Sequence, residues 1–302
     1  MARTFPLLKL PLLAQQQIIR TMDCHSTITF SMGSQKMKYL VRRMNFRAKC
    51  FRIYVGNNEI RVTSDEARID VKFCLKENEP DSFRALGMLW DCNARRMRDW
   101  MEILKYIYNC DRYGLLFFDG CEQFRVNFLR EEFEQLEHQE IRLITASDAY
   151  AIEVLQTFVP VKQLMINKDP FPTRDGLEVI ICRPFDELVL HQIPTTVIEL
   201  ININAINMEC WKCNITEEDL NLFSRLWIHG EYPRLSSMFL KIVKADFDEI
   251  KVFEEMEYEV EKKPDDEVFK KVYWIKGLDG KKASIRFNEW GELTDVYFKV
   301  QK

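Results

Sequence analysis

The side chains best suited to metal or redox chemistry are two cysteines, Cys210 and Cys213, which are separated by two residues. This spacing can hold zinc or form a redox pair, but a structural zinc site needs four ligands. No second cysteine pair or histidine pair follows at metal-ligand spacing, and the nearest histidine, His229, lies sixteen residues beyond Cys213. We therefore predict two thiols near a strand end in a reduced protein, with no metal and no cofactor.

Other catalytic signatures are also missing from the sequence. The four histidines, at positions 25, 138, 191 and 229, lie far apart, and His229 is expected at a helix C-terminus, where the helix dipole favours it. The chain contains neither of the glycine-rich loops, Gly-x-Gly-x-x-Gly and Gly-x-x-x-x-Gly-Lys, that cradle phosphates. These patterns predict that the chain is not an enzyme.

Composition and charge divide the chain into two parts. The 302 residues are 47% hydrophobic, which predicts about two domains with a substantial core. Residues 1–52 hold ten Lys or Arg and a single carboxylate, Asp23, so this stretch is strongly basic although the whole chain has a net charge of −4. The acidic total disfavours a whole-chain binder of nucleic acid or of a membrane surface.

Cysteine usage and apolar run lengths predict the compartment. The nine cysteines are scattered at irregular intervals, mostly beside apolar neighbours, as in a reduced intracellular protein. No apolar run approaches the ~20 residues that span a bilayer. We therefore expect a cytoplasmic or nuclear protein with no membrane partner.

The N-terminal segment predicts three short helices. Pro11 suits the first turn of a helix whose stripe of apolar residues ends at Asp23. A second helix is expected from about Ser26 to Met32, and Ser34 can cap a third. Three short helices in about 40 residues cannot close a large core of their own. This unit is expected to pack on something else.

The rest of the chain predicts an α+β or α/β fold. Residues 49–75 alternate as two or three strands, and short strands then alternate with helices to about residue 243. The strands at Ile144, Ile166 and Leu190 recur at intervals of 22 and 24 residues, close to a leucine-rich repeat. The expected architecture is thus an irregular leucine-rich-repeat-like α/β domain, closed by a C-terminal antiparallel β cap.

Individual segments carry further expectations. A helix is expected with Leu129, Phe133 and Leu136 on one face, and residues 185–190 and 197–203 both read as strands. A helix should start at Thr216, with Asp219 completing a capping box, and its Phe223 and Trp227 are expected in the core. The acidic run from Glu254 to Glu261 is interpreted as a solvated face or linker.

The first segment, LKLPLLAQQQIIRTMDCHSTITFSMGSQKM, resembles an F-box. Leu10-Pro11 falls on its Leu-Pro start, and FPLLKLP is the form that this start takes in the large nematode F-box families. The sequence departs from the general pattern at Leu13, where an acidic residue is common, and at Gln15 and Gln16, where apolar residues are common. The matching positions on the three F-box helices are Ile18, Met22, Asp23, Ile28, Phe30, Ser31, Met32 and Ser34 to Met37.

A second resemblance covers the C-terminal part. The segment DLNLFSRLWIHGEYPRLSSMFLKI is similar to the signature of the type 2 F-box-associated domain, and VKQLMINKDPF, FDELVL and DGKKASIRF fit its flanking blocks. Together the two resemblances cover most of residues 5–290. They imply an F-box at residues 1–46, a linking β segment at 47–93 and an F-box-associated substrate-recognition domain at 94–302.

The resemblance implies a substrate-receptor subunit of an SCF-type (Skp, cullin, F-box) ubiquitin ligase. The F-box would dock on a Skp-family adaptor, and through it on a cullin, while the C-terminal domain would bind an unknown target protein. The alternatives are a non-ligase protein-interaction scaffold and a nucleic-acid-binding module that uses the basic N-terminus. The adaptor-binding residues that the resemblance implies are Leu10, Pro11, Leu13, Ile18, Ile19, Met22, Ile28 and Met32.

Overall fold

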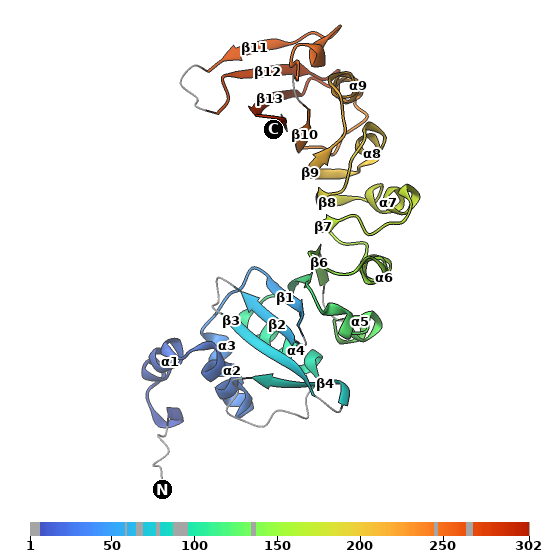
Figure 1. Cartoon of the computed structure of the whole chain (residues 1–302). Coiled ribbons are helices and arrows are strands. Elements are labelled where there is room, and N and C mark those ends of the chain that lie inside the picture. The colour runs from blue at the N-terminus through green and yellow to red at the C-terminus, as the bar shows by residue number, and fades with distance from the viewer. Residues whose placement is uncertain are drawn as a thin grey trace. The chain divides into compact units, whose positions relative to one another are not determined.

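A computed structural model of the chain shows a mixed α/β protein (Figure 1). It divides into two compact units, Met1–Gln139 and Glu140–Lys302. This division falls at neither of the two predicted domain boundaries, 46/47 and 93/94. Both boundaries stay predictions, and the one at 93/94 lies outside the described residues. The structure describes residues 7–57, 59–64, 69–76, 79–86, 96–133, 137–244, 247–263 and 268–301.

The first unit begins with the three predicted helices. The second of them starts two residues earlier than predicted because Asp23 caps it, accepting a hydrogen bond from the Ser26 amide at 2.7 Å. Ser34 caps the third helix by accepting a hydrogen bond from the Met37 amide, as predicted. The elements are η1 (Leu7–Lys9), α1 (Leu12–Thr21), α2 (Cys24–Met32) and α3 (Gln35–Arg43).

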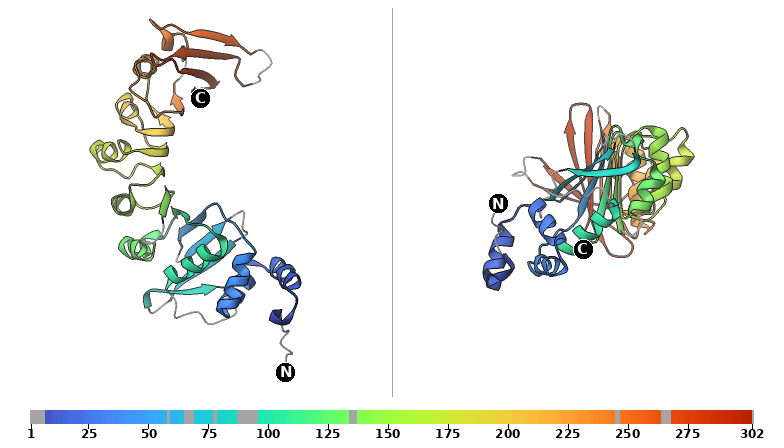
Figure 2. Two further views of the ribbon diagram at one scale, coloured as in Figure 1. Left: turned by 180° about the vertical axis from the view of Figure 1, so that it is seen from behind. Right: turned by 90° about the horizontal axis from the view of Figure 1, so that it is seen from below.

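A sheet and a long helix complete this unit. Helix α4 buries Met97, Trp100, Leu104 and Ile107, which recur at helical spacing, and contacts both α2 and α3. The strand order is β5-β1-β2-β3-β4, with β1 antiparallel to β2 and parallel to β5. From behind, α4 lies across one face of this sheet (Figure 2). The elements are β1 (Phe51–Gly56), β2 (Glu59–Ser64), β3 (Ile69–Lys76), β4 (Glu79–Leu86), α4 (Met97–Tyr108), β5 (Arg112–Phe117), η2 (Cys121–Gln123) and α5 (Val126–Phe133).

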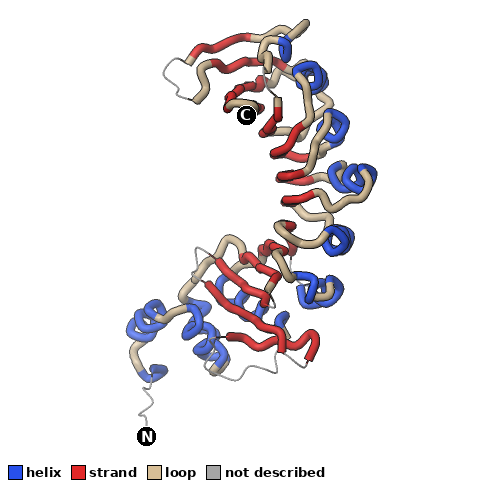
Figure 3. The backbone as a smooth tube through the Cα atoms, in the orientation of Figure 1, coloured by secondary structure: helices blue, strands red, loops and turns tan. Residues whose placement is uncertain are grey.

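The second unit is built from consecutive strand and helix pairs. Strands β6 to β10 pair in chain order and are all parallel, and each is joined to the next by one helix. These helices lie on one side of the strands (Figure 3). The elements are β6 (Glu137–Leu143), α6 (Asp148–Phe158), β7 (Gln163–Lys168), α7 (Arg174–Ile181), β8 (Phe185–Gln192), α8 (Val197–Asn202), β9 (Ala205–Cys213), α9 (Glu217–Ile228) and β10 (Ser237–Val243).

Antiparallel strands extend this sheet beyond β10, as predicted for the tail. The order is β10-β14-β13-β12-β11, and each neighbouring pair is antiparallel. Gly291, with φ of 61°, occupies the tight turn between β13 and β14. The elements are η3 (Lys251–Phe253), β11 (Glu259–Lys262), β12 (Lys271–Lys276), β13 (Lys282–Trp290) and β14 (Leu293–Val300).

One predicted strand is wrong, because residues 197–203 contain helix α8. The Thr196 backbone amide donates a 2.8 Å hydrogen bond to Glu199, and the Thr196 side chain completes a capping box that starts the helix. Helix α7 was not predicted, and of strand β9 only an end near Cys210 and Cys213 was expected. The paired positions Leu164, Leu188 and Met208 give strand intervals of 24 and 20 residues, so the strand and helix alternation is present. Its identification as leucine-rich-repeat-like stays a prediction.

The core of the second unit lies between the strands and their helices. Alternate strand residues point toward the helices and are buried, Leu164, Leu188 and Leu240 among them. Phe223 and Trp227 of α9 are also buried, as predicted, and both meet the ring of Phe298 on β14 edge to face. The acidic run of residues 254–261 is mostly exposed, as expected, and Leu136 lies outside the described residues.

Candidate functional site

The eight predicted adaptor-binding residues differ sharply in exposure. Ile19 and Ile28 are 0% exposed and belong to the core of the helical unit, whereas Leu13 is 76% exposed. Pro11 is also exposed, and the remaining four are half-buried. In this fold, the side chains available to a partner are therefore Leu10, Pro11, Leu13, Ile18, Met22 and Met32; their role in adaptor binding stays a prediction.

The polar Gln15 has a structural function. Its side chain is buried, and Nε2 donates a hydrogen bond of 2.7 Å to the carbonyl oxygen of Leu10 and a longer one of 3.4 Å to that of Leu8. A buried carbonyl that loses its donor is costly, so these bonds hold the segment before α1 against the helix. The departure from the apolar pattern at this position thus positions Leu10 and Pro11.

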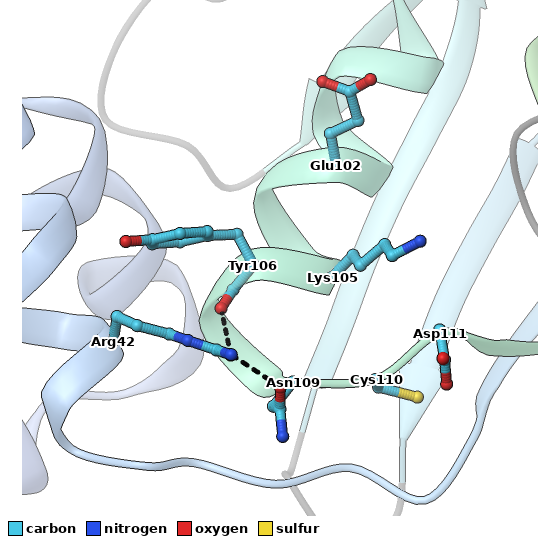
Figure 4. Close-up of a pocket in the computed structure, with 7 residues that line it drawn as sticks. All are labelled: Arg42, Glu102, Lys105, Tyr106, Asn109, Cys110 and Asp111. Carbon is cyan, nitrogen blue, oxygen red and sulfur yellow. Dashed lines mark hydrogen bonds between the residues drawn. The ribbon is translucent and has the colours of Figure 1, made fainter.

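Helix α3 is fastened to the C-terminal end of α4 by its basic side chains. Arg42 donates hydrogen bonds of 2.6 Å to the carbonyl oxygen of Tyr106 and to Oδ1 of Asn109 (Figure 4). The ammonium of Lys38 lies 4.6 Å from the centre of the Tyr106 ring. A pocket of about 690 Å³ lies beside this junction, and Arg42, Tyr106 and Asn109 line it together with Lys105. The positive charges of Lys38 and Arg42 in the N-terminal segment are therefore engaged in contacts within the first unit.

The second unit presents a sheet surface on the side away from its helices, which we call the open face. It consists of the residues of β6 to β10, β14 and β13 that alternate with the buried ones. Partners directly opposite each other in register point to the same face, so a row of side chains crosses the sheet. This row contains Arg142, Met165, Val189, Glu209, Phe239, Tyr297 and Arg286.

Aromatic rings are in contact across the open face. His191 and Trp211 stack with their ring centres 5.0 Å apart and their planes 5° from parallel. Trp211 meets Phe239 edge to face at 5.3 Å, and Phe239 meets Tyr297 at 5.0 Å. Lys241 lies 4.8 Å from the centre of the Trp211 ring. Trp211 nevertheless remains 37% exposed, so the row leaves an aromatic surface open to solvent.

Three carboxylates gather beside these rings. Glu140, Glu187 and Glu209 line a pocket of about 160 Å³ together with Arg142 and His191. Burial raises the pKa of Glu187, and the negative charges of Glu209 and Glu140 add to the rise. Burial lowers the pKa of His191, which favours its neutral form. The pocket therefore concentrates negative charge in a partly desolvated place.

The cysteine pair lies inside β9, close to its end. Cys210 and Cys213 are both buried and form no disulfide, and the Cys213 thiol donates a hydrogen bond of 3.2 Å to the Cys210 carbonyl oxygen. Its side-chain interaction with Cys210, together with burial, raises the pKa of the Cys213 thiol. In the described ranges, no group of three or more His, Cys, Asp or Glu side chains could hold a metal ion. His229 follows the last residue of α9, and its Nδ1 shares a 2.7 Å hydrogen bond with the Arg225 carbonyl oxygen.

Residues 177–240 match the model of the F-box associated family. The chain is also 22% identical, over 98% of its length and 97% of the relative's, to the F-box associated domain-containing protein sdz-33 of Caenorhabditis elegans. These matches confirm the predicted relationship to nematode F-box-associated proteins. No solved structure matches the chain significantly. None of the helices in the described part of the chain is long and apolar enough to cross a membrane.

The F-box-associated segment coincides with the centre of the open face. It runs from α7 through β10 and so contains His191, Trp211, Glu187, Glu209 and Phe239. Sequence reasoning did not select these side chains as a site. The signal was present as alternation of buried with polar or aromatic residues, but it could be read only after the strand at residues 205–213 had been recognised.

Proposed function

We propose that this chain is a substrate-receptor subunit of an SCF-type ubiquitin ligase in the cytosol or nucleus. The helical N-terminus docks on a Skp-family adaptor, which links it to a cullin, and the second unit binds the target protein. The chain itself carries out no catalytic step, because ubiquitin transfer belongs to other subunits. The proposal is supported by the F-box-associated match and by the F-box-like residues before it.

The proposal rests mainly on the position of the matched residues in the fold. The F-box-associated segment contributes the central strands of the open face, whose Trp211 is exposed and whose Glu187 and Glu209 line a pocket. Aromatic side chains are enriched in protein interfaces, and an exposed tryptophan is a frequent centre of binding energy. This arrangement suits protein binding better than catalysis.

Adaptor binding would use the apolar side chains that α1 and its flanks leave accessible. Ile18 lies in the last turn of α1 and Met22 is the residue that follows the helix, and both are half-buried. Leu10 and Pro11 precede them, in a segment fixed by Gln15. Docking would cover this incomplete apolar surface, which the small helical unit cannot bury by itself.

The direct test is binding of purified full-length chain to a purified Skp-family adaptor, measured by biolayer interferometry. We expect saturable one-to-one binding that survives moderate salt, since apolar contacts carry it. Target binding without adaptor binding would favour a non-ligase scaffold. Retention on RNA or DNA that falls steeply with salt, without adaptor binding, would favour the nucleic-acid alternative.

A further inference from the structure

We propose that the open face holds an extended segment of the target in which a Lys or Arg side chain enters the carboxylate pocket and an adjacent apolar side chain packs on Trp211. This inference rests on the proposed function, because it names the chemistry of the target that the second unit would bind. It follows from the charge and size of one pocket and from the aromatic ring beside it.

The charge of the pocket is not balanced from within. Arg142 is the one cation among the residues lining the pocket, and it is already paired with Glu140. No ion pair joins Glu187 or Glu209 to a cation among the residues that the structure describes, although Trp211 Nε1 donates a 3.3 Å hydrogen bond to Glu209. An incoming ammonium or guanidinium group would therefore find two carboxylates available to accept charge-assisted hydrogen bonds.

Two cations farther along the open face, Lys241 and Arg286, are already engaged. Lys241 lies over the Trp211 ring and has Asp295 Oδ1 at 3.7 Å. Arg286 lies 4.6 Å from the centre of the Phe269 ring and 6.0 Å from that of Tyr297. These cations are already engaged by rings or by a carboxylate, so charge complementarity favours a basic partner over an acidic one.

The size of the pocket fits one long side chain. Its volume of about 160 Å³ is roughly five times the ~30 Å³ that a water molecule occupies in the liquid. Val189 and Met165 supply apolar walls for a methylene chain, and the three carboxylates line the same pocket. A Lys or Arg side chain has this construction, with an apolar stem and a charged end.

Trp211 gives the next side chain of the segment a place to pack. His191 stacks on its ring and the Lys241 ammonium lies 4.8 Å from the ring centre, which together hold the ring in position, and the side chain remains 37% exposed. A ring held in place loses little conformational entropy when a partner covers it. The recognised segment is therefore a basic residue with an apolar or aromatic neighbour.

The test uses a positional-scanning array of acetylated and amidated hexapeptides probed with the full-length chain. We expect Lys or Arg beside an apolar residue to be selected, and binding of the best soluble peptide to be measured by fluorescence anisotropy. Glu187→Gln combined with Glu209→Gln should weaken that binding at least tenfold, and so should Trp211→Ala. The matched control, Glu153→Gln with Asp175→Asn, removes two exposed carboxylates from α6 and α7 and should change binding less than twofold.

A variant with reversed charge provides a second test, in case the Glu→Gln variants lose binding for a reason other than the lost negative charge. Glu209→Lys should shift selection on the array from basic toward acidic peptides, with circular dichroism confirming the fold. Selection of no basic residue by the wild-type chain, or equal binding by the carboxylate double variant and its control, would overturn the inference. Adaptor binding is measured on the same preparations. Adaptor binding without basic-peptide selection overturns this inference alone, whereas basic-peptide selection without adaptor binding refutes the ligase role.

Discussion

Replacing Ile18 and Met22 together by Asp should weaken adaptor binding without unfolding the chain. Both side chains are half-buried in the isolated chain, so only a minority of their surface remains for a partner to cover. Full burial of such a side chain is worth about 1.5–3 kcal/mol, so covering about a third of each would contribute at most about 2 kcal/mol for the two together. At ~1.4 kcal/mol per factor of ten, the loss of these contacts corresponds to a reduction of up to about 30-fold. Desolvation of the new carboxylates would add to it.

The neighbouring Ile19 provides the contrast. It is 0% exposed, so Ile19→Asp would place an unpaired carboxylate in the core and should destabilise the helical unit by several kcal/mol. Loss of adaptor binding by Ile19→Asp should therefore come with a lower melting temperature, and loss by Ile18→Asp/Met22→Asp should not.

The assay is biolayer interferometry against a Skp-family adaptor, with thermal melting monitored by circular dichroism on the same samples. The matched control is Val179→Asp/Ile198→Asp, which makes the same chemical change at two apolar side chains, 62% and 61% exposed, on α7 and α8. Undiminished adaptor binding by a folded Ile18→Asp/Met22→Asp chain would refute the assignment of these two residues to docking. An equal loss in the control would show a non-specific effect of charge.

Three further outcomes are expected. Leu13→Glu restores the acidic residue common in F-boxes at a side chain that is 76% exposed, so melting should show a stability change within about 0.5 kcal/mol, and adaptor affinity should not fall. Gln15→Ala removes the donor to the partly buried Leu10 carbonyl and should lower the free energy of unfolding by about 0.5–1.5 kcal/mol in urea titrations, whereas Gln16→Ala should cost less than about 0.5 kcal/mol. Glu187→Gln should stabilise the chain at neutral pH. Folding raises the pKa of Glu187, so the folded state binds more protons than the unfolded state. Ionisation of Glu187 therefore costs stability once the pH rises above the usual pKa of a glutamate. That gain should vanish in melts below about pH 4, where Glu187 is protonated in both states, and a gain independent of pH would contradict this explanation.

Local signals in the sequence predicted the helices that have strong caps. Thr216 and Asp219 were recognised as a capping box, and α9 begins there. Thr196 and Glu199 form the same motif in the structure, yet residues 197–203 were interpreted as a strand. The apolar and β-branched residues of that segment have high strand propensity, and a six-residue helix is too short to show a helical period. The Thr-x-x-Glu capping box was a local signal for this helix, but the strand propensity of the apolar residues outweighed it in the interpretation.

Prediction of the candidate surfaces has a different limit. Ile18 and Ile19 are chemically identical neighbours, and only the turn of about 100° between them on a helix makes one half-buried and the other part of the core. The rings of His191, Trp211 and Phe239 come from three strands, and of one of these only an end was predicted. Their proximity depends on the register of parallel strands about 20 to 30 residues apart, which no local pattern specifies.

The open face also carries features that the stability of the fold does not explain. The buried residues of β7 to β10 supply the contacts that hold the second unit together, and the residues alternating with them could be small and polar without loss of that core. Instead, the open face keeps an exposed Trp211 and places Glu187 where burial and neighbouring carboxylates disfavour its charge. The second arrangement lowers the stability of the isolated chain at neutral pH, and the first leaves apolar surface in water. A cationic, partly apolar ligand would reverse both effects at once, by neutralising the carboxylates and covering the ring, and this is the physical reason for locating target recognition on this surface.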